Sequence, residues 1–235
     1  MKRLVVLTGA GISVESGFKT FRGSDGLWEE HRVEDVASIE GWERDPELVI
    51  DFYNMLRKKL KDAKPNEAHK ILAELENSFE VYVITQNVDD LHERGGSTNI
   101  IHLHGELTKV RSVRNDYLIK DIGYGEISYG EKGEDGAQLR PHIVWFGEAV
   151  PMIETAARTV READIFAVIG SSLVVYPAAG LVSYMRPGTP AFLIDPNEID
   201  MRLPSNFTVI KDTAANGTRK MRDILAEKLG ESVRI

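Results

Sequence analysis

The sequence predicts an α/β fold in which a parallel sheet is covered by helices on both faces and carries a second, smaller lobe. Four short apolar runs lack the polar alternation of half-exposed strands, which is typical of parallel strands buried on both faces. Helical stretches lie between these runs, and two segments, residues 20–78 and 107–140, interrupt the alternation. The four predicted strands are residues 4–7, 81–84, 165–169 and 191–194.

The helices are predicted from their start signals and from their position between the strands. Asp45 is a candidate N-cap and Pro46 follows at the first helical position, which predicts a helix over residues 45–62. Further helices are predicted over residues 66–76, 151–164 and 214–230. The segment 20–78 holds loop and helix without an apolar strand, whereas 107–140 is polar and rich in glycine, tyrosine and charge. We expect these two insertions to form the smaller lobe.

Composition excludes several classes of protein. The chain has 235 residues with 37 acidic and 29 basic side chains, and its net charge of -8 argues against a general nucleic-acid binder. It contains no cysteine, so neither a disulfide nor a thiolate zinc site is available. The sequence shows neither a secretory signal nor an apolar run long enough for a membrane span. We therefore expect a cytoplasmic protein without a membrane partner, and a monomer.

A glycine-rich turn follows the first predicted strand. Gly9 and Gly11 lie where a dinucleotide fold needs a tight turn and a close approach of backbone to phosphate. The third glycine of the usual spacing is replaced by Val14. Nucleotide binding and a plain strand-to-helix turn both remain open for this motif. The next loop carries Phe21 and Arg22, which either close over a cofactor or belong to a surface loop.

Polar residues also follow the other three strands. Each group has an ordinary explanation as a helix cap or a turn. The carboxyl ends of parallel strands meet at one sheet edge, where ligands bind, so the four groups together favour a dinucleotide site. The groups are Gln86, Asn87 and Asp89; Gly170, Ser171 and Ser172; and Asp195, Pro196 and Asn197.

These motifs, in this order, resemble those of the sirtuins, NAD-dependent protein lysine deacylases, and come closest to the bacterial members. The matching stretches are GAGISVESGFKTFRG, TQNVDDLH, HLHGEL, RPHIVWFGE, GSSLVVYPAAG and DPN. The resemblance implies one catalytic domain over residues 1–235. It implies a Rossmann-like large lobe, residues 1–30, 79–106 and 140–235, and a small lobe, residues 31–78 and 107–139. It also implies that NAD is consumed as a co-substrate while an acylated lysine of a protein is deacylated.

The resemblance assigns roles position by position. It implies that His104 is the general base and that Asn87 assists it. The substrate peptide is expected to pair as an added strand. The implied NAD-binding residues are Gly9, Ala10, Gly11, Ile12, Phe21, Arg22, Gln86, Asn87, Val88, Asp89, Gly170, Ser171, Ser172, Asp195, Pro196, Asn197 and Ala214. The implied substrate-binding residues are Tyr53, Arg57, Val144, Phe146, Gly147, Glu148, Leu173, Val174 and Val175.

The first departure from the family pattern concerns zinc. Most sirtuins bind structural zinc through four cysteines, whereas here Ser112 stands where the first is expected. We therefore expect no metal. We expect the small lobe to be held by packing of apolar and aromatic side chains, namely Tyr117, Leu118, Ile119, Ile122, Tyr124, Ile127 and Tyr129.

The second departure concerns the acyl group. Members that remove succinyl or malonyl groups carry Tyr-x-x-Arg on a helix, but here Tyr53 is followed by Leu56, and Arg57 comes one position later. One residue is a rotation of about 100° around a helix, so we favour deacetylation. Desuccinylation, demalonylation and long-chain deacylation remain alternatives. So do protein ADP-ribosylation and, from a different class, a non-catalytic NAD sensor.

His102 precedes the expected base by two residues. In an extended chain such residues share one face, so His102 and His104 could point the same way. A metal pair would need further ligands, and no others occur at a useful spacing. We expect His104 to be the base and His102 to pack or form hydrogen bonds along the same strand.

Overall fold

The computed structural model describes residues 1–17, 27–198 and 203–229, and its large lobe is built on a six-stranded parallel sheet. From edge to edge the strands are β5 (Ile100–His102), β4 (Glu80–Thr85), β1 (Arg3–Thr8), β9 (Ile165–Ile169), β10 (Ala191–Ile194) and β11 (Phe207–Ile210). Renumbered along the chain, this is the 3-2-1-4-5-6 order of Rossmann folds. The predicted fold class is confirmed, and all four predicted strands lie in this sheet.

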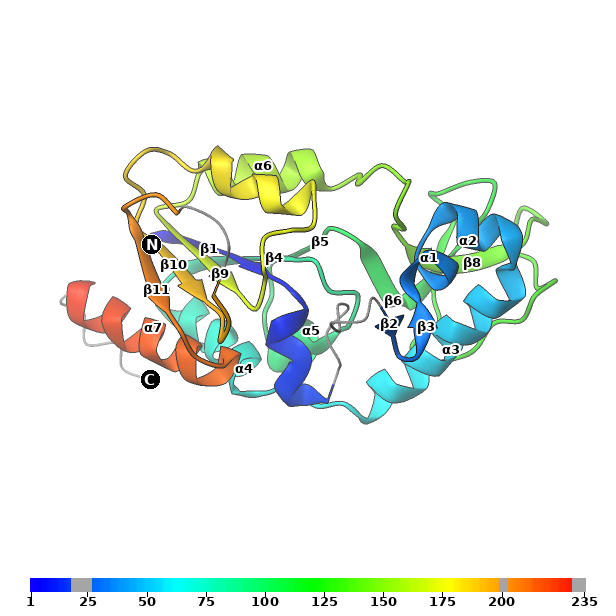
Figure 1. The fold of residues 1–235 in the computed structure, drawn as a ribbon, viewed down its shortest axis with the longest axis horizontal. Helices are drawn as coiled ribbons and strands as arrows, with labels where there is room; N and C mark the ends of the chain where they lie inside the picture. The colour runs from blue at the N-terminus through cyan, green and yellow to red at the C-terminus, as the bar shows by residue number, and fades with distance from the viewer. Residues whose placement is uncertain (18–26, 199–202, 230–235) are drawn as a thin grey trace.

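Helices cover both faces of the sheet because each strand is apolar on both sides (Figure 1). Leu4 and Val6 of β1 pack toward α4 (Glu67–Glu74) and α7 (Ala214–Leu229). Val5 and Leu7 pack toward α6 (Ile153–Arg161) and the 3-10 helix η3 (Ala178–Tyr184). Three short helices complete the lobe: η1 (Ala10–Ser16), η2 (Leu75–Asn77) and α5 (Leu91–Gly95).

The small lobe combines a helical part with an antiparallel sheet and lies at the opposite end of the molecule from α7 (Figure 1). Its helices are α1 (Val33–Val36), α2 (Ile39–Arg44) and α3 (Pro46–Asp62), beside the hairpin β2 (Leu27–Trp28) and β3 (His31–Arg32). Its sheet has the order β7 (Ile119–Asp121), β6 (Gly105–Ser112) and β8 (Leu139–Ile143). The strand-like stretch at residues 142–148 overlaps the end of β8, but β6 and β7 were not predicted as strands. β8 lies across the expected lobe boundary at residue 140.

The core of the small lobe differs from the predicted one. Ile127 is buried, and Ile122 and Tyr124 pack against buried clusters, as expected. The prediction is wrong for Tyr117, Ile119 and Tyr129, whose exposed fractions are 92%, 46% and 58%. Ile119 lies on the edge strand β7, which is exposed along its length. One core cluster joins α3 to the two longer strands through Ile50, Val110, Ile127 and Leu139, and a larger cluster packs other α3 side chains against Leu107 and Ile143.

Hydrogen bonds around Ser112 tie together the ends of the polar insertion. The buried Ser112 hydroxyl donates to Asp135 Oδ2 at 2.6 Å and accepts from the Arg114 amide at 3.0 Å. The other oxygen of Asp135 accepts from the Ala137 amide at 3.0 Å. The Ser112 hydrogen bond lowers the pKa of Asp135 below its usual value. These bonds join residues 112 and 135, near the two ends of the polar insertion in which we expect no zinc.

We expect His69→Gln to make the protein more resistant to acid. His69 is fully buried at the third position of α4, and its Nδ1 accepts from the Asn66 amide in a capping box. Burial lowers the pKa of His69 to about 4, so between pH 6.5 and 4 the unfolded chain binds a proton that the folded chain does not. This group therefore removes about 1.4 kcal/mol of stability per pH unit as the pH falls through that window.

Glutamine also closes a capping box but does not titrate. The difference in unfolding free energy between His69→Gln and wild type should therefore grow in favour of the variant from pH 7 to pH 4.5. Urea titrations at four pH values measure it. A difference that does not change with pH would contradict the burial of a neutral His69.

Candidate active site

A cavity of about 620 Å³ lies at the carboxyl ends of the central strands and extends to the small lobe. Residues that follow β1, β4, β9 and β10 line one side of it, and Tyr53 of α3 and Ile143 of β8 line the other. The four polar or glycine-rich groups that follow the predicted strands therefore meet in one place. The sheet order reverses direction between β1 and β9, and such a switch point is where α/β sheets bind ligands.

Backbone contacts between glycines shape the base of this cavity. The Gly9 amide donates to the Ile169 carbonyl at 3.0 Å, and the Gly11 amide donates to the Gly170 carbonyl at 2.9 Å. Gly170 has φ +62° and lies against the backbone of Gly11. Only residues without a Cβ allow the two chain segments to approach so closely, which explains why both strand ends carry glycine.

Three polar side chains at the cavity form a buried hydrogen-bonded group. Asn87 Nδ2 donates to Ser13 Oγ at 3.0 Å, and the Ser13 hydroxyl donates to Asp89 Oδ2 at 2.9 Å. The other carboxylate oxygen of Asp89 accepts from the Leu91 amide at 3.1 Å. Burial raises the pKa of Asp89 to about 6, although the bonds from Ser13 and Leu91 oppose this rise. At pH 7 Asp89 is thus an ionised and almost fully buried acceptor.

His104 lies in the link between β5 and β6 and lines the cavity. Its Nδ1 donates to the Gln86 carbonyl at 2.9 Å, so Nε2 is the nitrogen that keeps a free lone pair. Burial lowers the pKa of His104, and the bond to Gln86 only partly opposes this. The imidazole is therefore neutral at pH 7 and can accept a proton at Nε2.

His102 does not share this cavity with His104. The chain leaves β5 at His102 and bends through residues 103 and 104, so the two rings do not follow the alternation of an extended strand. His102 Nε2 lies 2.7 Å from Glu93 Oε1, and its Nδ1 lies 3.3 Å from the Asn87 carbonyl. Its hydrogen bonds therefore run to α5 and to the loop after β4, not along its own strand as expected.

On the side of the cavity toward the small lobe, an ion pair holds the segment that carries the lining residues. Glu148 lines the cavity and accepts from Arg140 at 2.7 and 2.9 Å and from the Trp145 amide at 2.8 Å. The Arg140 guanidinium lies 3.6 Å from the centre of the Trp145 ring. Trp145 Nε1 in turn donates to the Tyr53 hydroxyl at 2.9 Å. The segment that carries Val144, Phe146 and Gly147 is thereby fixed between the two lobes.

Most of the expected site residues line the cavity, but some lie elsewhere. Ile12 is buried in the core beneath the sheet, and Leu173 packs in the core on its other face. Val174 is exposed and outside the cavity lining, and Phe21 and Arg22 fall outside the described residues. The expected residues that do line it are Gly9, Ala10, Gly11, Tyr53, Gln86, Asn87, Val88, Asp89, His104, Val144, Phe146, Gly147, Glu148, Gly170, Ser171, Ser172, Val175, Asp195, Pro196, Asn197 and Ala214.

Arg57 is not part of the cavity lining. Its Nε donates to the Leu107 carbonyl at 2.8 Å and its Nη1 donates to Asn54 Oδ1 at 2.7 Å, inside the small lobe. Its side chain is fully buried, and burial lowers the pKa of Arg57 to about 10. Arg57 lies one residue after the arginine of the Tyr-x-x-Arg pattern, and this shift along α3 directs its side chain into the small lobe. Leu56, at the arginine position of that pattern, packs in the core.

Several lining residues were not predicted from the sequence. Ser13, which joins Asn87 to Asp89, follows the glycine turn within the quoted motif, and its polar type was the available signal. Glu15 also lines the cavity and accepts from the Ala215 amide at the start of α7 at 2.9 Å. The other unpredicted lining residues are Val14, Trp28, Ala37, Ile143, Val150, Tyr176, Pro177, Glu198 and Thr213; Trp145, for which the sequence left a core role and a place at the cleft open, also lines the cavity.

Comparisons with known proteins show which family this chain resembles. A model described as the Sir2 family matches residues 9–177. An NAD-dependent protein deacylase of Bacteroides thetaiotaomicron is 55% identical over 230 residues, covering 96% of this chain and 98% of the relative. One from Helicobacter pylori is 48% identical over 231 residues, covering 97% and 99%.

Solved structures show the same similarity. A Sir2 homologue in complex with NAD has a TM-score of 0.84 at 40% identity and covers 95% of this chain and 91% of that chain. A Sir2 homologue with ADP-ribose has a TM-score of 0.85 at 40% identity and covers 96% and 94%. Since the family model spans more than half of the chain and the relatives match it almost from end to end, this protein belongs to the Sir2 family.

Proposed function

We propose that this protein is an NAD-dependent protein lysine deacylase that transfers the acyl group to ADP-ribose with release of nicotinamide. The observation that carries the proposal is the neutral, tautomerically fixed His104 beside the Asn87–Ser13–Asp89 group in one cavity. Relatives named NAD-dependent protein deacylase and neighbours solved with NAD support it. Among the described residues, no helix is both apolar and long enough to cross a membrane.

The residues present fit NAD. Gly9 and Gly11 line the cavity without side chains, so a pyrophosphate can approach the backbone of the turn closely, and Asp195 follows β10, where a carboxylate suits ribose hydroxyls. Asp89, ionised at pH 7, suits the amide hydrogens of a nicotinamide carboxamide. Bound NAD supplies the ribose carbon that accepts the acyl oxygen as nicotinamide leaves.

The chain's own groups then have distinct tasks. His104 Nε2 accepts a proton from a ribose hydroxyl, because its other nitrogen is committed to the Gln86 carbonyl. Ser13 holds Asn87 and Asp89 in fixed orientations, so neither side chain has to reorganise during the reaction.

We further propose that the acyl group is neutral, with acetyl preferred. The described residues that line the cavity include no lysine or arginine, whereas Glu15, Asp89, Glu148, Asp195 and Glu198 are acidic. Arg57, the candidate partner for an acyl carboxylate, is bonded inside the small lobe. The cavity wall contributed by the small lobe is largely apolar and includes Trp28, Ala37, Tyr53 and Ile143.

Nicotinamide release from one peptide bearing acetyl, butyryl, long-chain, malonyl or succinyl lysine tests both proposals. We expect kcat/KM to be at least about 10-fold higher for acetyl than for succinyl, because an unpaired carboxylate is costly to bury. O-acetyl-ADP-ribose should accumulate in solution. ADP-ribose attached to protein would favour ADP-ribosyltransfer, and NAD binding without acyl-dependent turnover would favour the sensor. A succinyl peptide that reacts faster than the acetyl peptide would contradict the neutral acyl pocket.

The finer sequence predictions remain predictions. They include the lobe boundaries, the cytoplasmic location and the monomeric state. A metal analysis of the purified protein tests the expectation that zinc is not bound.

A further inference from the structure

Three consecutive carbonyls of the loop after β4, residues 86–88, are bound by a single segment of chain. The first accepts from His104 Nδ1 at 2.9 Å, and the second accepts from His102 Nδ1 at 3.3 Å. The third accepts from the Leu107 amide at 2.7 Å. The segment 102–107 therefore fixes the backbone from which the side chain of Asn87 projects into the cavity.

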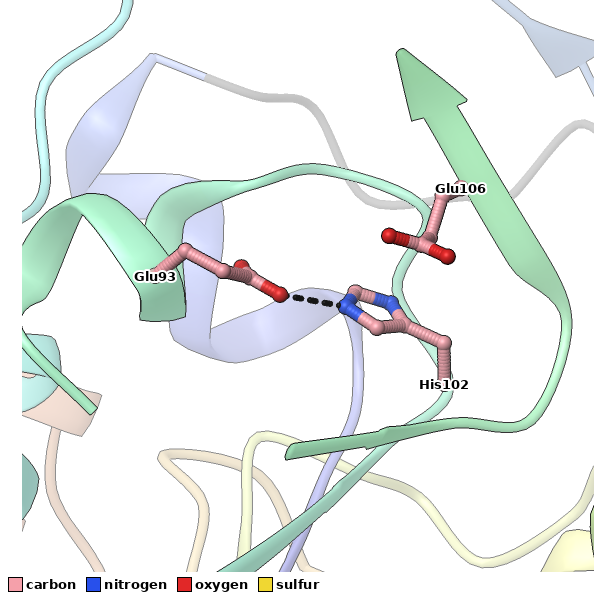
Figure 2. Close-up of side chains that lie close together, drawn as sticks. All are labelled: Glu93, His102 and Glu106. Carbon is pink, nitrogen blue, oxygen red and sulfur yellow. Dashed lines mark hydrogen bonds and ion pairs between the residues drawn. The ribbon is translucent and has the colours of Figure 1, made fainter. Parts of the chain in front are cut away.

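His102 differs from the other two donors because its second nitrogen is also engaged. Its Nε2 lies 2.7 Å from Glu93 Oε1, and Figure 2 shows the imidazole between Glu93 and Glu106. A ring that donates from Nδ1 to a carbonyl and from Nε2 to a carboxylate carries both protons and a positive charge. Burial is the largest single influence and lowers the pKa of His102, but the hydrogen bond and charge of Glu93, together with Glu106 and the Asn87 carbonyl, raise this pKa above its usual value.

The groups that face His102 come from three elements. Glu93 lies on α5 and is itself exposed, and Glu106 lies on β6 and is paired with Lys109 at 2.8 Å. Asp89, from the loop after β4, and His92, from α5, also interact electrostatically with the ring. Ligand atoms of Glu93, His102 and Glu106 lie within 4.8 Å of one another, but each of these side chains already has a partner.

We propose that the Glu93–His102 ion pair is a positioning device for Asn87 in the reaction of the proposed deacylase. While His102 is charged, it holds the Asn87 carbonyl and the Glu93 carboxylate together. A neutral imidazole has one N–H and keeps only one of these two bonds. Loss of the proton therefore releases either the Asn87 carbonyl or the Glu93 carboxylate. The loop then loses the middle one of its three anchors, and Asn87 is oriented less precisely.

Glu93→Gln tests the proposal, because glutamine can still accept from Nε2 but carries no charge. We expect the alkaline decline of kcat/KM for NAD to move to lower pH by about one unit or more. In His102→Gln this decline should be lost, and kcat should be about 10-fold below wild type with an unchanged KM for the peptide. Glu43→Gln, the same change at an exposed glutamate of α2, should keep the wild-type profile.

A second measurement does not depend on activity. The His102 imidazole, assigned by its loss from the NMR spectrum of His102→Gln, should titrate at lower pH in Glu93→Gln than in wild type. Unchanged pH profiles in both variants, with only a lower melting temperature, would overturn the positioning role. An unchanged His102 titration would overturn the ion pair itself. A wild-type protein without acyl-dependent turnover would instead overturn the proposed function, which separates the two failures.

Discussion

Replacing His104 with alanine should lower kcat by roughly 10³-fold, the contribution expected of a general base. His104 is the one histidine among the described cavity-lining residues, and its Nε2 is the nitrogen left free by the bond to the Gln86 carbonyl. The same bond anchors the loop at residue 86, but the neighbouring anchors from His102 and Leu107 remain in the variant. NAD binding, measured by calorimetry without peptide, should therefore be nearly unchanged while nicotinamide release is lost.

Rescue by a small base gives this prediction its control. Added imidazole should restore part of the turnover of His104→Ala, because the deleted ring leaves space beside the cavity and the missing function is proton acceptance. Imidazole should have no such effect on His102→Gln, because in that variant Asn87 is misoriented and the general base is still present. A loss of turnover in His104→Ala of less than about 10-fold would contradict a general-base role.

The parts of the fold that could be predicted are those that local sequence determines. Runs such as residues 165–169 are fully buried, so each position had to be apolar, and the pattern was visible without knowledge of the neighbours. The edge strand β7 of the small lobe was missed for the opposite reason. β7 is exposed along its length and has three residues, and it exists because it pairs with β6. Ile119 is exposed on this edge strand and Tyr117 is exposed in the turn before it, although their residue types suggested burial.

The candidate site divides in a similar way. Gln86, Ser171 and Asp195 could be placed together because parallel strands deliver their ends to one edge, so strand position alone predicts the neighbourhood. Side-chain direction could not be predicted in that manner. Arg57 lies on the expected helix, yet its side chain donates to the Leu107 carbonyl. The Glu93–His102 ion pair joins α5 to β5, and no motif in the sequence predicts that these two residues are in contact.

Gly170→Ala should abolish high-affinity NAD binding and destabilise the protein by about 3 kcal/mol or more. A Cβ at this position would lie 2.3 Å from the Ile12 amide nitrogen and 2.5 Å from the Gly11 carbonyl carbon. Both neighbours are backbone atoms, so no side chain can rotate away, and the glycine turn after β1 has to shift. The Cα of Gly11 also packs against Gly170. A shift of the glycine turn therefore moves the backbone surface on which we expect the pyrophosphate to lie.

The control for this steric argument is a glycine that shares the backbone strain but not the contact. Gly188 has φ +80°, and no atom lies within 4 Å of the position that its Cβ would take. Gly188→Ala should therefore cost about 1 to 2 kcal/mol, the penalty of a left-handed conformation alone, and leave NAD affinity unchanged. Chemical denaturation and calorimetry with NAD on both variants separate the two contributions. If Gly170→Ala lost no more stability or NAD affinity than Gly188→Ala, the close packing of β9 against the glycine turn would not be what shapes the NAD site.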